Sequence, residues 1–196
     1  PKPSSAASDV YKRQGLIEIV RNFGKDYREA QLIHRLDKAT SGCIILTKNK
    51  QSTRLYNSFL RSNQIIKKYH CLVHGSWSKD LNNVKLPLQI NKRKNLPKIT
   101  VSADGKYSET NFRLIKFNDF YSLLECSLET GRTHQIRVHT SASGFPIVGD
   151  LKYSSIALNK EIEKRMYLHC SSLKVTNKDL KITSKVPNSF FEAFED

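Results

Sequence analysis

Alternating apolar and polar residues in the middle and late parts of the chain constrain its fold more than any other feature. Around residue 70, Tyr69, Cys71 and Val73 alternate with neighbours that are polar except for one leucine, namely Lys68, His70, Leu72 and His74, which is the period of a half-buried strand. Further strands are predicted over residues 99–102, 109–117, 121–128, 168–175 and 180–183. Because the link at 116–119 is short enough for a hairpin, strands next to each other in sequence should pair. The sheet should therefore be mixed and largely antiparallel.

Helical spacing of apolar residues surrounds these strands. It predicts helices over 16–23, 50–62 and 133–142, and a final short helix that carries Phe190, Phe191 and Phe194. A buried strand is expected over 43–47. Strands dominate and no internal repeat is visible, so the predicted fold class is α+β. We expect one domain over residues 15–196, preceded by a polar, aperiodic leader over 1–14 that is disordered or artificial.

The charge of the chain narrows its choice of partner. Lys and Arg number 33 against 18 Asp and Glu, which gives a net charge of +15. A polyanion explains this excess, since each neutralised phosphate releases counterions. The alternative is that the excess only aids solubility. Residues 76–97 form a long basic stretch with Lys92, Arg93 and Lys94 at its centre.

The four cysteines are widely spaced in apolar stretches and form no Cys-x-x-Cys pair. This pattern predicts small buried side chains in a reducing compartment, not a zinc or redox site. No apolar run reaches the length of a membrane span. His134 and His139 are five residues apart, which does not place them on one helix face as metal ligands. We therefore expect a cytoplasmic protein without a metal.

Four segments interrupt the simple core pattern. HRLDKATSG (34–42) places a single acid, Asp37, among cations in a turn, where it could also serve as an ordinary turn cap. GRTHQIRVH (131–139) concentrates donors at a predicted helix start, which favours anions. KKYHCLVHG (67–75) and GFPIVGDLKY (144–153) are, taken singly, more typical of architecture than of function.

Together, in this order and spacing, the four segments resemble the motifs of the RluA-type pseudouridine synthases. HRLDKATSG meets every fixed position of that family's HRLDxxTSG, and GRTHQIRVH matches its counterpart outright. KKYHCLVHG is similar to KxYxAxVxG with Cys71 replacing alanine, and GFPIVGDLKYS to GxPIxGDxxYG with Ser154 replacing glycine. Residues 101–110 and the basic stretch most resemble the RluC-like large-subunit ribosomal RNA branch. The family's opening Lys-Pro-x-Gly element is only faintly matched near Lys2, and the S4 RNA-binding domain common in that branch is expected to be absent.

The resemblance implies an isomerase that converts uridine to pseudouridine in RNA. Its base or nucleophile is Asp37, and Arg137 is the partner that favours the ionised carboxylate. Tyr69 would stack on a flipped-out uracil over the apolar Ile136, with Arg35 near the substrate. The further residues expected to contact RNA are Lys67, Lys68, Arg132 and His134.

Isomerisation gains and loses no atoms, so no cofactor is expected. The predicted partner is RNA, most specifically large-subunit ribosomal RNA, and the protein is expected to act as a monomer away from membranes. Two alternatives stay open: a synthase of the same family that acts on transfer RNA, and a catalytically idle RNA-binding or ribosome-assembly factor.

Overall fold

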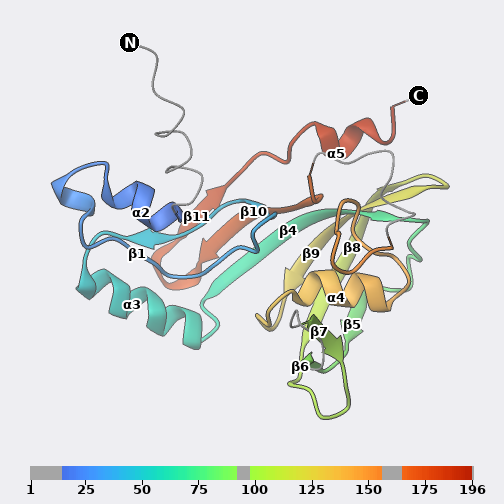
Figure 1. The fold of residues 1–196 in the computed structure, drawn as a ribbon, viewed down its shortest axis with the longest axis horizontal. Helices are drawn as coiled ribbons and strands as arrows, with labels where there is room; N and C mark the ends of the chain where they lie inside the picture. The colour runs from blue at the N-terminus through green and yellow to red at the C-terminus, as the bar shows by residue number, and fades with distance from the viewer. Residues whose placement is uncertain (1–14, 92–97, 156–164, 196) are drawn as a thin grey trace. The chain divides into compact units, whose positions relative to one another are not determined.

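The structure is a computed structural model that describes residues 15–91, 98–155 and 165–195 (Figure 1). Two compact units are present. The first lies within Pro1–Arg35 and Ile44–Gln64, and the second within Leu36–Cys43 and Ile65–Asp196. The predicted leader and the Lys92–Lys94 cluster lie outside the described residues.

The first unit is mainly helical. Its elements are α2 (Leu16–Arg21), η1 (Lys25–Tyr27), β1 (Gln31–Leu32), β3 (Leu46–Thr47) and α3 (Lys50–Arg61). β1 and β3 pair antiparallel. Asn49 caps α3, since its side chain accepts a hydrogen bond of 2.9 Å from the Ser52 amide, and the helix buries Phe59. The helices expected from periodicity in this region are therefore present.

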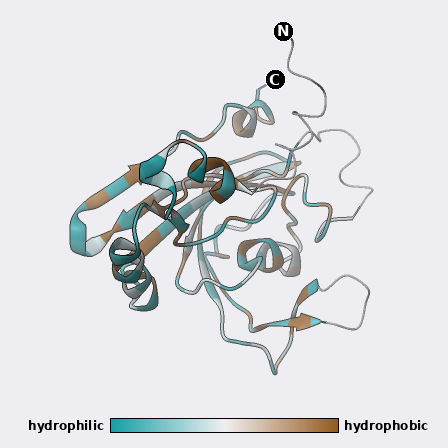
Figure 2. Ribbon diagram, turned by 60° about the vertical axis from the view of Figure 1, so that its left-hand side comes forward, coloured by the Kyte–Doolittle hydropathy of each residue, from teal (hydrophilic) through white to brown (hydrophobic). Residues whose placement is uncertain are grey.

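The second unit is built on a seven-stranded sheet in the order β11-β10-β4-β9-β8-β5, with β2 parallel to β10. The strands are β2 (Ser41–Gly42), β4 (Ile65–His74), β5 (Asn83–Lys85), β8 (Glu109–Phe117), β9 (Tyr121–Leu128), β10 (Leu168–Val175) and β11 (Leu180–Thr183). All pairings except that of β2 are antiparallel, which confirms the predicted mixed, largely antiparallel α+β fold. Figure 2 shows hydrophobic and hydrophilic residues interleaved along the strands.

A second, two-stranded sheet and several short helices complete this unit. They are β6 (Leu88–Asn91) and β7 (Lys98–Val101), α4 (Gln135–Ala142), η3 (Thr176–Lys178) and α5 (Ser189–Glu192). The β6–β7 pair packs against α4 and the loop after it through Leu88, Ile99, Val138 and Tyr153. No described helix combines the length and apolar character that crossing a bilayer requires.

Two local predictions differ from the structure. The strand expected over 43–47 is reduced to β3 at 46–47, which pairs with β1, whereas residues 41–42 just before it pair with β10 in a different sheet. The basic stretch 76–97 contains β5 and β6, which were not predicted, although Val84, Leu86, Leu88 and Ile90 alternate there with polar residues and Pro87. Pro87 has no amide hydrogen to donate to a sheet and separates the two strands. All four cysteines are free and buried, as predicted.

Candidate active site

The loop that carries Asp37 is anchored to the central sheet. Its turn closes with a 2.8 Å hydrogen bond from the Thr40 amide to the Asp37 carbonyl, and the next two residues form β2. The Ser41 hydroxyl lies 2.9 Å from Nδ1 of His169 on β10 and also accepts a hydrogen bond from Arg165. The Thr-Ser-Gly end of the motif therefore docks the Asp37 turn against β10.

Gly42 permits this docking because the two backbones approach closely. Its φ is +108°, and a Cβ added there would lie 2.2 Å from the Cys170 carbonyl oxygen. Any side chain would collide with backbone, which cannot rotate out of the way as the end of a side chain can.

We therefore expect Gly42→Ala to lower the free energy of unfolding by more than about 2 kcal/mol, through backbone strain and overpacking. Gly131→Ala is the matched control, since a Cβ there meets no atom within 4 Å. The control should stay within about 0.5 kcal/mol of the parent protein. Urea denaturation measures both, and equal midpoints for the two variants would contradict this account of the docking.

The start of α4 is held by Gln135, which is buried. Its Oε1 accepts hydrogen bonds from the Thr130 hydroxyl at 2.7 Å and the Arg132 amide at 3.0 Å. Its Nε2 donates to the Glu109 carbonyl at 2.8 Å and the Thr110 hydroxyl at 2.9 Å. Because every hydrogen-bonding position of the amide is used, Gln135 ties the GRTHQIRVH segment to β8 and sets the direction of the helix.

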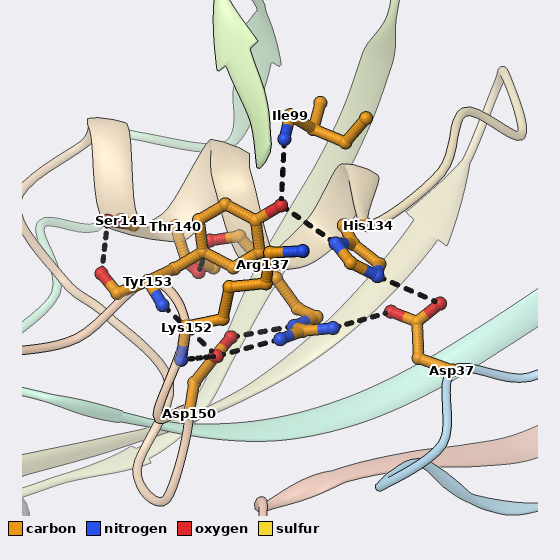
Figure 3. A network of polar contacts seen from close by, with 9 residues as sticks. All are labelled: Asp37, Ile99, His134, Arg137, Thr140, Ser141, Asp150, Lys152 and Tyr153. Atoms are coloured by element: carbon orange, nitrogen blue, oxygen red, sulfur yellow. Dashed lines mark hydrogen bonds and ion pairs between the residues drawn. The ribbon is translucent and has the colours of Figure 1, made fainter. Parts of the chain in front are cut away.

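Arg137, on α4, lies between two carboxylates (Figure 3). Its Nη1 donates to Asp37 Oδ2 at 3.1 Å. On the other side, Nε and Nη2 donate to the two oxygens of Asp150 at 2.7 and 2.8 Å, a bidentate pair. The Asp37 side chain retains 18% of its accessible surface, whereas that of Asp150 retains none. Asp37 is therefore the carboxylate that a ligand can reach.

Several groups hold the guanidinium in this position. Burial lowers the pKa of Arg137, but hydrogen bonds and attraction from Asp150 and then Asp37 outweigh it, so the pKa is raised overall. The guanidinium also lies over the Tyr153 ring, 4.9 Å from its centroid. Asp150 is fixed in turn, because its Oδ1 accepts from the backbone amides of Lys152 at 3.0 Å and Tyr153 at 3.2 Å.

Tyr69, on β4, lies in the buried face of the sheet with 7% of its surface exposed. Burial is the main cause of a raised pKa at its phenol, followed by Cys170 and then Asp37. Tyr69 is therefore a neutral phenol near the Asp37 carboxylate.

The other residues predicted to bind substrate or RNA differ in burial and in their distance from Asp37. Ile136 is buried in α4, at 4% exposure. His134 lies 3.8 Å from Asp37 Oδ1 through its Nε2. Arg132 is exposed and donates through Nε to the Tyr107 carbonyl at 3.0 Å. Arg35 is exposed and belongs to the first unit, so no position relative to Asp37 is assigned to it.

The two lysines of β4 lie on opposite faces of the sheet, as successive strand residues do. Lys67 shares the face of Tyr69, and burial lowers its pKa while nearby Cys170 raises it. Lys68 forms an ion pair of 3.1 Å with Glu125, which also pairs with Arg113 at 3.2 Å. Lys67, unlike Lys68, is therefore on the same side of the sheet as the candidate site.

Sequence reasoning missed two residues of the site, Asp150 and Tyr153. Both lie in the GFPIVGDLKY segment, where they occupy the fixed D and Y of the GxPIxGDxxYG motif, but the sequence analysis gave neither residue a role in the site. The signals that could have found them are these two fixed motif positions and the acid directly after Gly149. That glycine has a φ of +76°, and a Cβ added to it would lie 2.0 Å from the Arg165 carbonyl oxygen, which marks a close-packed turn. In the described ranges no group of three His, Cys, Asp or Glu side chains could hold a metal ion.

The sequence is similar to a known protein family and to curated proteins. The profile of a family described as RNA pseudouridylate synthase matches residues 2–142. Ribosomal large subunit pseudouridine synthase C of Salmonella typhi is 37% identical over 170 residues, which cover 83% of this chain and 53% of that protein. The Escherichia coli K12 protein of the same name is 36% identical over the same shares. The chain thus spans about half the length of these curated relatives.

Two solved structures share the fold. Human RNA pseudouridylate synthase domain containing 1 superposes with a TM-score of 0.74 at 25% identity, covering 81% of this chain and 71% of that one. Human RNA pseudouridylate synthase domain containing 4 gives a TM-score of 0.72 at 22% identity, with coverage of 95% and 81%. The second likeness concerns the fold alone.

Proposed function

Since the chain belongs to the RNA pseudouridylate synthase family, we propose that it isomerises uridine to pseudouridine in RNA, with large-subunit ribosomal RNA as its substrate. Residues 15–196 would act as the catalytic domain. The observation that carries the proposal is the pairing of Asp37 with Arg137 at 3.1 Å, which leaves the carboxylate partly accessible.

The reaction breaks the N1–C1′ bond, turns the uracil and joins C5 to C1′. It therefore requires one ionised oxygen near the ribose and a pocket that retains the detached base. Asp37 supplies that oxygen, either by attack on C1′ or by removal of the C2′ proton. Arg137 stabilises its negative charge close to the phosphates of the RNA, and Asp150 stops the guanidinium from turning towards those phosphates.

The uridine must leave its stack before Asp37 can reach the ribose, which costs about a few kcal/mol. Stacking on an aromatic side chain returns roughly 1–3 kcal/mol per base. Tyr69 is a buried aromatic residue near Asp37, and burial raises the pKa of its phenol, which stays uncharged. Ile136, next to Arg137 on α4, would supply the apolar floor below the uracil.

The wider contact with RNA is electrostatic. Lys67, on the face of Tyr69, and the exposed Arg132 and Arg35 would bind phosphates, which hold the RNA without reading its sequence. Lys68 would contribute from the opposite face through the charge network it shares with Glu125. We place the protein in the cytoplasm and expect it to act as a monomer with neither metal nor cofactor.

The proposal is tested by incubating the purified protein with large-subunit ribosomal RNA and, separately, with bulk transfer RNA, and mapping pseudouridine in both. We expect new pseudouridine in the ribosomal RNA. Modification of transfer RNA alone would replace the proposed substrate by the alternative from the same family. Binding to both RNAs without any modification would favour an idle RNA-binding factor.

RNA affinity should fall steeply with salt. If three or more phosphates are neutralised, raising the salt from 50 to 200 mM should weaken binding at least about tenfold, because counterion release scales with the number of contacts. Filter binding or fluorescence anisotropy with a ribosomal RNA fragment measures this. A salt-independent affinity would argue against a phosphate-binding surface on this protein, whose net charge is +15.

A further inference from the structure

His134 adopts an unusual backbone conformation at the start of α4. Its φ and ψ are 56° and 22°, in the left-handed region. For a residue other than glycine this costs roughly 1–2 kcal/mol, and such residues persist where the surroundings impose them. Here the conformation accompanies a side chain that faces Asp37 (Figure 3).

The hydrogen bonds around the ring indicate where its proton lies. The Ile99 amide can only donate, and it donates to the Tyr153 hydroxyl oxygen at 3.2 Å. That hydroxyl has one hydrogen to donate, and among the contacts of the described residues Nδ1 of His134, 2.7 Å away, is the acceptor within reach of it. Nδ1 is then the acceptor, so the proton of the neutral ring sits on Nε2. Nε2 is the atom that faces Asp37 Oδ1 at 3.8 Å.

We propose that Ile99 and Tyr153 fix His134 in the Nε2-protonated tautomer, and that this N–H positions the second oxygen of Asp37 when a nucleotide fills the site. The inference rests on the proposed function. Asp37 would then be held at both oxygens, by Arg137 at Oδ2 and by His134 at Oδ1. The present 3.8 Å exceeds a hydrogen bond, and contacts of this kind tighten when substrate binds. His134 is a positioning residue in this scheme.

The charges that face His134 come from three segments. Asp37 lies on the loop before β2, Arg137 on α4 itself, and Asp150 and Lys152 on the loop that also carries Tyr153. Burial lowers the pKa of His134 most; Asp37 then raises it and Arg137 lowers it, and the net pKa lies below the ordinary histidine value. The ring is therefore neutral at pH 7, as the tautomer requires.

The first test reads the tautomer directly, without RNA. Nitrogen NMR of histidine-labelled protein, with the His134 signal assigned by its loss in His134→Asn, should show Nε2–H in the parent protein. Tyr153→Phe keeps the ring over Arg137 but removes the hydroxyl, so the tautomers should mix and the His134 pKa should rise. Tyr167→Phe, at a buried tyrosine outside the site, should change neither. An Nδ1–H tautomer in the parent protein would overturn the proposal.

The second test separates positioning from backbone conformation. Asparagine tolerates the left-handed region but is too short to offer a donor at the place of Nε2, whereas the glutamine amide reaches it. We expect His134→Asn to lower kcat about 10- to 100-fold with little change in KM, because the carboxylate loses its alignment. His134→Gln should recover most of that loss.

If the kcat of His134→Asn equals or exceeds that of His134→Gln, His134 serves only the backbone turn into α4, and the positioning role is wrong. The pH profile of kcat gives an independent readout: any step that follows the His134 pKa should move to higher pH in Tyr153→Phe and stay in place in Tyr167→Phe. If the parent protein forms no pseudouridine, the proposed function is refuted, whereas the NMR result still decides the tautomer.

Discussion

Replacing Asp37 by asparagine is expected to abolish pseudouridine formation while RNA binding stays nearly unchanged. Asparagine has the same shape and can still accept a hydrogen bond from Arg137, which lies 3.1 Å from the carboxylate. It lacks the negative charge, so it can neither attack C1′ nor remove a proton from C2′. The loss in turnover should be at least about 10³-fold, as for other groups that act directly in the chemical step.

The measurement pairs a single-turnover pseudouridine assay with RNA binding by anisotropy. Asp119→Asn is a suitable control, since it makes the same chemical change at an exposed turn residue. We expect that variant to match the parent protein in both assays. If Asp37→Asn retained normal turnover, the carboxylate could not be the reacting group. If it lost RNA binding to the same extent as turnover, its role would be structural.

Removing one charge from the Arg137–Asp150 pair should have the largest effect on stability. Neutralising one partner leaves the other charge buried without compensation, which costs about 3–5 kcal/mol. We expect this range for Arg137→Gln, because the Asp150 side chain has no accessible surface. Asp150→Asn should cost less, since Arg137 keeps Asp37 as a partner and asparagine still accepts from the Lys152 and Tyr153 amides.

The double variant Arg137→Gln/Asp150→Asn removes both charges and leaves two amides that can pair. It should be more stable than the sum of the single losses predicts, by about 1–3 kcal/mol, because the residues are in direct contact. Urea denaturation of the four proteins gives this coupling energy. Additive losses would show that the two side chains do not stabilise each other.

Activity should not follow stability in this series. Asp150→Asn keeps Arg137 but loosens its guanidinium, and displacement of a positioning group by about 1 Å can cost 10²-fold in rate. The double variant should regain stability and stay inactive, because Asp37 has lost its cation. Recovery of turnover in the double variant would mean that Asp37 needs no positive partner.

Local pattern determined most of the sheet. The strands at Glu109–Phe117, Tyr121–Leu128, Leu168–Val175 and Leu180–Thr183 begin and end at the predicted residues. Each carries several apolar residues that alternate, and short turns join them in pairs, so neighbours in sequence are also partners in the sheet. The strand expected over 43–47 was mostly wrong, because residues 46–47 pair with β1 and residues 41–42, just before the expected strand, pair with the distant β10 in another sheet.

The residues of the candidate site also divide into those that the sequence indicated and those that only the structure revealed. Asp37, Tyr69 and Arg137 could be proposed from motifs in the sequence, since each motif is short and contiguous. No local pattern shows that Asp150 is the second partner of Arg137. Nor does it show that Tyr153 directs the proton of His134.

The sequence by itself therefore determined most of the longer strands, the helices and the identity of the candidate reacting group. Only the tertiary structure decided which buried charges compensate each other and which ring nitrogen faces Asp37. The physical reason is that burial and hydrogen-bond geometry depend on all the elements that meet at a point. Here those elements are the loop before β2, α4, β7 and the loop 144–153, which are separated by up to about a hundred residues, as between Asp37 and Arg137.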